Sequence, residues 1–329
     1  MFENIFKKNK YLDCHLMKHS IHFFYDNIRA CCSNVSGPIF YPNYNGENVD
    51  WNYIYSIRKS TFKEINNFFN KNELPKCCVG CCEASSHFSN KPVENFENMI
   101  DKMYFHYHMT CNAKCTYCTY ENIERGYKYK VLPLVKSLID NRILSKQAQV
   151  YMSGGEITIS SEFEELLSTL LNYLESKIEI LTSGIRYCKS IEEAFIQNKC
   201  MLMISLDSSN SETYKKIKQV DCFDKVVENI KNYIKATDNA KENITMKYII
   251  VDGVNDTTEE ILSFIKLVKS LGLKKIRLDF DYEKYKFTGS LNVPKNYYNL
   301  YNIFNKVATE ENLSIQHCGQ IDAILNKSN

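Results

Sequence analysis

The sequence predicts an α/β fold in which a partial barrel of parallel strands follows a small cysteine-rich module. Three observations lead to this prediction. From about residue 101, short apolar segments alternate with amphipathic helical ones, which is typical of parallel βα units. Polar or glycine-bearing clusters follow the apolar segments, as expected where strands end at a functional face. Cysteines gather before residue 95, ahead of this alternation.

Length and composition are ordinary for a globular protein. The chain has 329 residues, of which 44% are apolar and 24% charged. Lys and Arg number 41 against 39 Asp and Glu, so the net charge of +2 gives no argument for nucleic-acid or anionic-membrane binding. There is no apolar run of roughly 18 residues and no signal-peptide pattern. We expect a cytoplasmic protein with no nucleic-acid or membrane partner, whose 14 cysteines bind metal or clusters rather than form disulfides.

The first predicted element is a β-hairpin. Ile21, Phe23 and Tyr25 fall at every second position, Asp26-Asn27 is a turn signal, and residues 28–30 return along the first strand. A helical pattern follows Trp51, and residues 77–82 then read Cys-Cys-Val-Gly-Cys-Cys. These pieces predict a compact module rich in thiols.

Six strands and the helices between them make up the predicted barrel. The strands are expected at residues 104–108, 149–153, 178–181, 202–206, 244–251 and 276–280. Helices are expected from Pro133, over 161–174, from Thr257 to Gly272 and over 294–310. Six units favour a partial (β/α)6 TIM-like barrel over full eight-fold closure. The predicted divisions are 1–95 for the cysteine-rich module, 96–285 for the barrel and 286–329 for a C-terminal helical closure.

The segment most informative about function is Cys111-Asn112-Ala113-Lys114-Cys115-Thr116-Tyr117-Cys118, a loop after the first barrel strand. Each iron of a [4Fe–4S] cluster normally takes a protein thiolate, so three cysteines leave one iron open to a substrate or cofactor. A structural zinc site usually has CxxC pairs and four donors, and a disulfide framework suits a small secreted chain. The spacing therefore favours a cluster with an open iron.

This CxxxCxxC spacing, with Tyr117 before the last cysteine, resembles the signature of the radical S-adenosylmethionine (SAM) superfamily. The resemblance extends over roughly residues 101–282. It implies that Cys111, Cys115 and Cys118 hold a [4Fe–4S] cluster whose open iron chelates SAM. It also implies that Tyr117 lies near the adenine.

A second motif of the family follows one βα unit later. Gly154-Gly155-Glu156 is similar to the motif that holds the methionine ammonium of SAM, since glycines let the backbone approach closely and Glu156 supplies an anionic acceptor. Ile157 stands where the family usually has proline, and this change removes no ligand.

Polar residues after later strands complete the cofactor site that the resemblance implies. Ser183 matches residues near the sulfonium and carboxylate, Ser205 and Asp207 match a Ser-x-Asp near the ribose, and Asn255 matches a residue on the adenine side. Each is also a common turn former, so a purely structural role is the alternative. Lys247 is placed to reach a carboxylate or, equally, to point outward.

The order of features before residue 95 resembles the auxiliary-cluster module called SPASM, although in most relatives that module follows the radical domain. The resemblance implies an auxiliary [4Fe–4S] cluster suited to electron transfer. The expected ligands are Cys14, Cys32, Cys78 and Cys81, with Cys31, Cys77 and Cys82 as alternatives. Structural zinc on the same thiolates is the alternative content of the site.

Catalytic residues are otherwise unknown, but three candidates remain. Asp279 and Asp281 lie two apart on the sixth strand and so on one side of it, where they could hold substrate hydroxyls or take a proton. A solvated strand end is the alternative. Cys318 could donate a hydrogen atom, although most single cysteines are buried and inert.

The resemblance implies an enzyme that cleaves SAM to a 5′-deoxyadenosyl radical and abstracts a hydrogen atom from its substrate. With an auxiliary cluster, oxidation or cross-linking of a peptide or protein is the expected outcome. Dehydrogenation or epimerisation of a sugar or other small molecule is the alternative within the family. A zinc-binding interaction protein is the alternative from another class. We expect an electron donor such as flavodoxin or ferredoxin.

Overall fold

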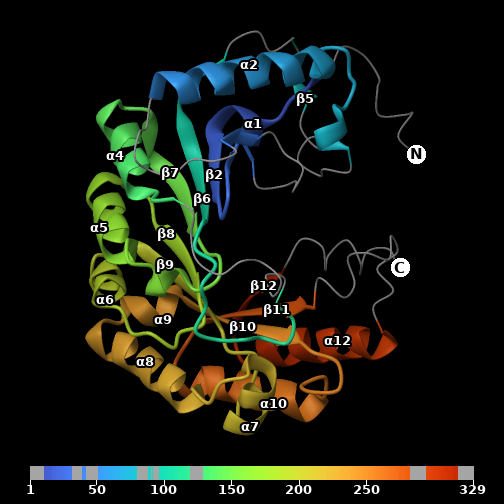
Figure 1. Cartoon of the computed structure of the whole chain (residues 1–329). Helices are drawn as coiled ribbons and strands as arrows, with labels where there is room; N and C mark the ends of the chain where they lie inside the picture. Colours follow the sequence, from blue (N-terminus) through green and yellow to red (C-terminus); the bar gives the residue numbers. More distant parts are fainter. Residues whose placement is uncertain are drawn as a thin grey trace. The chain divides into compact units, whose positions relative to one another are not determined.

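The computed structural model describes residues 11–31, 39–41, 51–79, 88–89, 91, 96–118, 129–281 and 294–317. The chain folds into two compact units (Figure 1). The first unit comprises Met1–Met109, Arg125–Gly154 and Ser161–Ser176, and the second comprises Thr110–Glu124, Gly155–Ser160 and Lys177–Asn329. The chain passes from one unit to the other several times. The predicted domain boundaries at residues 95 and 285 stay a prediction.

The first unit contains both parallel and antiparallel strands. Its described strands are β1 (Tyr11–Leu12), β2 (Ser20–Phe24), β3 (Ile28–Arg29), β4 (Ile39–Tyr41), β5 (Phe88–Ser89), β6 (Ile100–His106) and β7 (Leu144–Met152). Its described helices are α1 (His15–His19), α2 (Trp51–Phe69), α4 (Leu132–Asp140), α5 (Phe163–Tyr173) and the short 3-10 helix η1 (Lys76–Cys78). The strand order is β7-β6-β2-β3-β4, parallel from β7 to β2 and antiparallel from β2 to β4. Strands β1 and β5 pair separately.

The predicted N-terminal hairpin is confirmed. Phe23 of β2 lies opposite Ile28 of β3, and the Phe24 N–H donates to the Asn27 carbonyl over 2.9 Å. The sequence pattern does not predict a second pairing, in which β2 runs parallel to β6 with Phe23 opposite Phe105. Both rings are fully buried and stack with their centroids 4.9 Å apart. The hairpin therefore shares the hydrophobic core of the first barrel strand.

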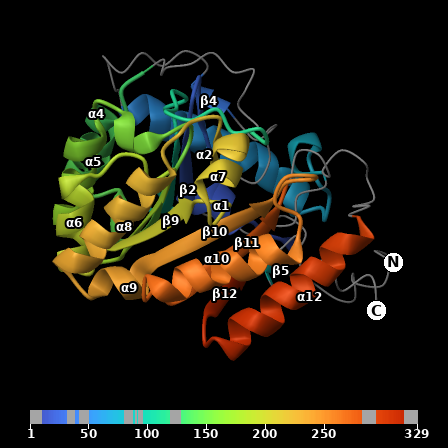
Figure 2. The ribbon, with the colours of Figure 1, turned by 90° about the horizontal axis from the view of Figure 1, so that it is seen from below.

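The second unit is a regular α/β structure. Its described strands are β8 (Ile178–Thr182), β9 (Cys200–Ser205), β10 (Ile244–Ile250), β11 (Lys275–Phe280) and β12 (Ser314–His317). Its described helices are α6 (Lys189–Ile196), α7 (Ser211–Lys218), α8 (Phe223–Ala236), α9 (Asn239–Asn243), α10 (Thr258–Ser270), α12 (Lys295–Glu310) and the 3-10 helix η2 (Ile157–Ile159). The strands are parallel in the order β8-β9-β10-β11-β12. Helices α8, α10 and α12 lie along one side of them (Figures 1 and 2).

The α/β class and the six predicted barrel strands are confirmed, with β6 and β7 beginning several residues earlier than predicted. The predicted cap of α10 is also present, since the Thr257 side chain accepts a hydrogen bond from the Glu260 N–H at 3.3 Å. Gly272, with φ of +70°, follows that helix. Strand β12 is not predicted, because four residues are too few to display a periodic pattern.

Among the helices within the described ranges, none is long and apolar enough to cross a membrane.

Candidate functional site

The loop of residues 111–118, called here the cysteine loop, is attached through its backbone to the end of α7. The Lys114 N–H donates to the Lys218 carbonyl over 3.0 Å, and the Thr116 N–H donates to the Ile217 carbonyl over 2.9 Å. The last carbonyls of a helix have no partner within the helix, so these bonds satisfy both elements. The Cys118 N–H also donates to the Cys115 carbonyl over 3.1 Å, which closes a turn. The loop therefore has a defined backbone.

The three thiols of the loop are free and partly exposed. Burial raises the pKa of Cys111 to about 11, against a hydrogen bond of 3.4 Å from the Ala113 N–H to its sulfur. Burial also raises the pKa of Cys115, and the Lys218 ammonium opposes that shift. Among the described side chains, no three of the His, Cys, Asp and Glu type are gathered closely enough to hold a metal ion in this conformation. Ligation would require the thiols to come together and lose their protons.

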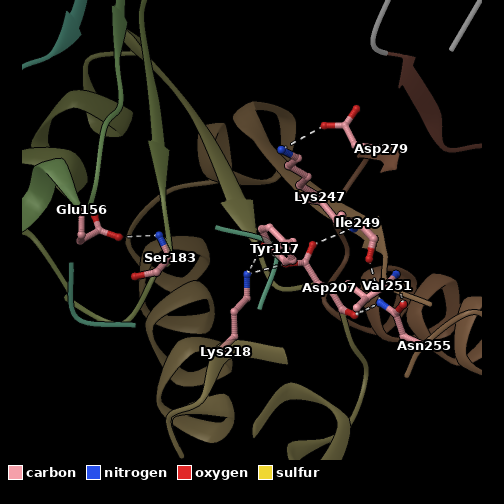
Figure 3. Close-up of polar contacts among 10 residues, drawn as sticks. All are labelled: Tyr117, Glu156, Ser183, Asp207, Lys218, Lys247, Ile249, Val251, Asn255 and Asp279. Carbon is pink, nitrogen blue, oxygen red and sulfur yellow. Dashed lines mark hydrogen bonds and ion pairs between the residues drawn. The ribbon is translucent and has the colours of Figure 1, made fainter. Parts of the chain in front are cut away.

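Glu156 is a buried carboxylate held at the start of η2. Its side chain is tied to β8, because Oε1 accepts a bond of 2.7 Å from the Thr182 hydroxyl and Oε2 accepts a bond of 2.6 Å from the Ser183 N–H (Figure 3). The Thr158 hydroxyl donates to Oε1 over 2.6 Å. The Glu156 N–H donates to the Thr110 carbonyl, next to the cysteine loop, over 2.8 Å. The carboxylate therefore has a fixed position.

Gly154 is required by its backbone conformation. Its φ is +123°, and a Cβ there would lie 2.7 Å from the His108 carbonyl oxygen. Any larger residue would be strained and would collide with backbone. Gly154 is therefore required for packing against the His108 backbone, and the predicted approach of the Gly154-Gly155 pair to SAM stays a prediction.

Ser183 connects the Glu156 carboxylate with the cysteine loop. While its N–H donates to Glu156, its hydroxyl donates to Asn112 Oδ1 over 3.1 Å. The structure therefore brings together residues from three separate segments of the chain, as their places after successive strands predict.

Asp207 is the centre of a closed network with Tyr117 and Lys218, called here the buried network (Figure 3). Asp207 Oδ2 accepts hydrogen bonds from the Tyr117 hydroxyl, at 2.5 Å, and from Lys218 Nζ. Lys218 Nζ also donates to the Tyr117 oxygen over 2.6 Å. Asp207 Oδ1 accepts from the Ile249 N–H at 2.8 Å. The side chains of Lys218 and Asp207 are only 2% and 0% exposed, so solvent takes no part.

The buried network changes the pKa values of its members. Burial, and then the Asp207 charge, raise the pKa of Tyr117. Burial tends to lower the pKa of Lys218, but the adjacent Asp207 carboxylate outweighs burial and the net shift is upward. Lys218 therefore stays an ammonium ion and Tyr117 a neutral phenol at neutral pH.

Asn255 lies beneath this network and is fully buried. Its Nδ2 donates to the carbonyls of Asp207 and Ile249, each over 2.8 Å, and its Oδ1 accepts from the Val251 N–H at 2.6 Å. Both amide hydrogens are thus used on the backbone. Tyr117 and Val254 pack against an apolar cluster nearby, made of Ile217, Ile249 and Val251.

The other predicted residues of this unit lie on β9 to β11. Ser205 is partly exposed and lies opposite Lys247. Lys247 does reach a carboxylate, since its Nζ lies 3.0 Å from Asp279 Oδ2 (Figure 3). Asp281, directly after β11, is partly exposed. Cys318 lies outside the described residues.

Four cysteines of the predicted module are described, all in the first unit. Burial raises the pKa of Cys78, and Cys77, Cys14 and Cys31 raise it further, so these three thiols lie within electrostatic reach of Cys78. The sulfurs of Cys77 and Cys78 are 3.8 Å apart. The predicted ligands Cys32 and Cys81, and the alternative Cys82, lie outside the described residues.

Sequence reasoning did not find Lys218, although a signal for it exists. Tyr214, Ile217 and Lys218 share one side of α7 at spacings of three and four residues, and all three are buried. A lysine on the apolar side of a helix needs a buried partner, and an acidic residue at a preceding strand end is a candidate.

The fold and the site together define an α/β protein of the partial TIM-like barrel type, with a thiol-bearing loop and a buried carboxylate at strand ends. Residues 107–268 match the family model described as the Radical SAM superfamily. The chain therefore belongs to the radical SAM superfamily, whose cofactors are a [4Fe–4S] cluster and SAM.

Curated relatives match part of the chain. A probable GTP 3′,8-cyclase of Saccharolobus islandicus is 27% identical over 174 residues, which is 51% of this chain and 53% of that protein. A GTP 3′,8-cyclase of Nautilia profundicola is 25% identical over 192 residues, or 55% of this chain and 56% of that protein. The chain thus spans about half the length of the curated relatives it matches.

Solved structures match more of the chain. SuiB of Streptococcus suis bound to its precursor peptide SuiA covers 84% of this chain with a TM-score of 0.54 and 16% identity, over 57% of SuiB. SuiB bound to SAM covers 82% of this chain, again over 57% of SuiB, with a TM-score of 0.53 and 15% identity. At this identity the likeness establishes the fold, and the predicted partial TIM-like barrel is confirmed.

Proposed function

We propose that this chain is a radical SAM enzyme that oxidises or cross-links a peptide or protein substrate. The observation that carries the proposal is the cysteine loop, anchored to α7 by its backbone and to Ser183 by Asn112, in a domain of this superfamily. Three thiols on one loop and a fixed carboxylate in the same unit are donors that fit a [4Fe–4S] cluster and the amino-acid part of SAM.

In this proposal Cys111, Cys115 and Cys118 hold the cluster. When bound, the cluster and SAM supply a 5′-deoxyadenosyl radical that takes a hydrogen atom from an unreactive C–H bond. Glu156 receives the methionine ammonium, because among the described residues Oε2 accepts a hydrogen bond from the Ser183 N–H alone and has a second lone pair for a cation. The Gly154-Gly155 backbone is assigned to contact with the cofactor.

The remaining predicted residues divide into two groups. The hydroxyls of Ser183 and Ser205 are partly exposed and are assigned to direct contact with SAM. The polar atoms of Asp207 and Asn255 bond within the protein, so we assign these residues to positioning Tyr117 and the cysteine loop. The ring of Tyr117 then forms an apolar surface beside the adenine.

We also propose an auxiliary [4Fe–4S] cluster in the first unit. The short distance of 3.8 Å between the sulfurs of Cys77 and Cys78 supports it, as does the electrostatic effect of Cys14 and Cys31 on Cys78. The proposed ligands stay Cys14, Cys32, Cys78 and Cys81, with Cys31, Cys77 and Cys82 as alternatives. Such a cluster would accept the second electron in a two-electron oxidation of the substrate. A structural zinc ion is the alternative content of this site.

The choice of a peptide substrate is supported by the likeness in fold to SuiB, which has been crystallised with a precursor peptide. A small-molecule substrate is the second candidate, favoured by the curated relatives named as GTP 3′,8-cyclases. In either case we expect flavodoxin or ferredoxin to supply the first electron.

The test is anaerobic reconstitution with iron and sulfide, followed by dithionite and SAM, with 5′-deoxyadenosine as the measured product. The variant is Cys111→Ala, Cys115→Ala, Cys118→Ala, and Cys222→Ala is the control, since Cys222 is a partly exposed thiol of the same unit outside the loop. We expect product from the wild type and the control only. Iron should fall by about four atoms per chain in the triple variant and remain at the auxiliary site.

A wild type that binds zinc but no iron would contradict the enzyme assignment. Iron that disappears completely in the triple variant would contradict the auxiliary cluster alone.

A further inference from the structure

A row of polar side chains crosses the partly exposed face of the strands in the second unit. Backbone pairing aligns Ser205 with Lys247, Lys247 with Arg277, and Arg277 with Gln316. All four side chains are partly exposed. Aligned residues of neighbouring strands point to the same face, so a hydroxyl, an ammonium, a guanidinium and an amide lie next to one another. Every member of this row can donate hydrogen bonds.

Two of these neighbours are cations, which is an unfavourable pairing unless an anion compensates it. Asp279 supplies one carboxylate: its Oδ2 lies 3.0 Å from Lys247 Nζ, and Arg277 Nε donates to Oδ2 and Oδ1 over 3.0 and 3.1 Å. One carboxylate offsets one of two cations. Lys247, Arg277 and Asp279, called here the open network, therefore have one positive charge in excess.

Among the described residues, neighbouring charges do not remove this excess. Burial raises the pKa of Glu179, and the charges of Arg277 and Lys275 oppose that shift. The negative charge of Glu179 is therefore shared between two cations, Arg277 and the additional Lys275. Asp281, beyond the end of the strand, has contacts of its own.

The two cations of the open network retain donors for a ligand. Their side chains are 17% exposed at Lys247 and 26% exposed at Arg277, compared with 10% at Asp279. Arg277 binds Asp279 through Nε, and no acceptor among the described residues contacts its two Nη groups. A guanidinium with both Nη groups open is suited to a planar, two-oxygen acceptor.

The row lies next to the candidate cofactor site. The Lys247 carbonyl accepts a hydrogen bond from the Asp207 N–H at 3.2 Å, and Ile249, two residues further along β10, donates to the Asp207 carboxylate. Figure 3 shows Lys247 and Asp279 beside this strand. A group bound by the open network would therefore be close to the buried network that positions the cysteine loop.

We propose that Lys247 and Arg277 bind a carboxylate of the substrate, with Ser205 and Gln316 donating from either side. This inference rests on the proposed function and gives the peptide substrate a chemical feature, an acidic side chain or a C-terminus. Asp279 aligns the two cations and is not a proton acceptor. A single excess charge suits a monoanion, whereas a nucleotide triphosphate has several negative charges and would be repelled by Asp279.

The test measures binding of a fluorescent alternating Glu-Ala peptide, and of the matching Gln-Ala peptide, to the reconstituted enzyme with SAM by fluorescence anisotropy. We expect the Glu-Ala peptide alone to bind. Lys247→Met and Arg277→Met should each weaken it about tenfold, since each removes charge-assisted hydrogen bonds. Lys266→Met, at an exposed lysine of α10, is the control and should have no effect.

Asp279→Asn separates this inference from a role in proton transfer. Loss of the competing carboxylate should tighten Glu-Ala binding about threefold, because the excess positive charge grows. Weaker or unchanged binding in Asp279→Asn would contradict the inference.

Three further outcomes would overturn it: equal binding of both peptides, displacement of the Glu-Ala peptide by GTP at lower concentration than by free glutamate, or loss of SAM affinity in Lys247→Met with peptide binding intact. The last would assign the cations to the SAM carboxylate. Formation of 5′-deoxyadenosine without peptide, measured in the same wild-type samples, reports separately on the proposed function.

Discussion

The second unit contains two networks built from the same parts, an aspartate with a lysine and one further donor, but in opposite surroundings. In the buried network, Asp207 and Lys218 are at most 2% exposed, and Tyr117 completes a closed set of hydrogen bonds. In the open network, Lys247 and Asp279 are 17% and 10% exposed, and the third member, Arg277, is a second cation. The first has balanced charges and the second does not.

Burial and charge balance together indicate the role of a charged residue near a cofactor. A buried pair with every partner inside the protein determines structure, because nothing remains to bind a ligand. A partly exposed group with an unbalanced charge and open donors is available for binding. Sequence motifs alone treat Asp207 and Asp279 alike, as acids at strand ends.

The largest effect is expected from the same substitution at the two lysines. Lys218→Met leaves the Asp207 carboxylate buried and unpaired, which should cost about 3–5 kcal/mol of unfolding free energy. Lys247→Met should cost less than about 1 kcal/mol, because Arg277 still pairs with a partly solvated Asp279. Urea unfolding of the apoprotein measures both, with the exposed Lys216→Met as the control on α7. Equal losses of unfolding free energy at the two sites would contradict the structural role assigned to the buried network alone.

Buried titratable groups that have no opposite charge beside them give a second prediction, for the dependence of stability on pH. In the first unit, His22 Nε2 lies 2.5 Å from His106 Nδ1, and burial lowers the pKa of His106 to about 4 and also lowers that of His22. The unfolded chain, with a histidine pKa of about 6.5, binds these protons first. Stability should therefore fall as the pH drops from about 6.5 to about 4, by up to about 3 kcal/mol for His106.

The measurement is urea unfolding across that pH range. His106→Gln should flatten the pH dependence, because glutamine does not titrate. A slope that is unchanged in this variant would place the acid sensitivity elsewhere.

The smallest effect is expected at the phenol of the buried network. Tyr117→Phe removes the hydroxyl but leaves the direct Lys218–Asp207 contact, so stability should fall by only about 1 kcal/mol. The cysteine loop should nevertheless open more often, and hydrogen exchange at the Lys114 and Thr116 amides should accelerate severalfold. Exchange at wild-type rates would mean that the hydroxyl has no part in positioning the loop.

The fold was predictable in its repeating parts. Mostly apolar segments such as Ile244–Ile250 are long enough to identify a strand, and parallel order follows from the helices between them. The partner of β2 was not predictable, since five residues do not specify whether a hairpin stands alone or joins β6. Strand β12 was not predicted either, because its four residues are too few to show a pattern.

The candidate site was predictable where chemistry follows from local spacing. Glu156 and Ser183 come together as their places after successive strands suggest, and both are bonded to each other. Lys218 was missed because its partner, Asp207, is 11 residues away across a turn and the pairing is visible only once α7 is placed. Asp279 was a candidate to hold substrate hydroxyls or take a proton, and the sequence did not predict that both of its oxygens contact cations.

The anchoring of the cysteine loop has a consequence for how its sequence can vary. Lys114 and Thr116 have exposed side chains, and they attach the loop through main-chain N–H groups only. The residue types at these two positions can therefore vary, whereas the number of residues from Asp207 to Lys218 cannot. One residue inserted into α7 would turn its last carbonyls by about 100° away from the loop. The length of helix α7 therefore sets the position of the thiols. The number of residues in this helix is a stricter constraint on the sequence than the residue types between the cysteines.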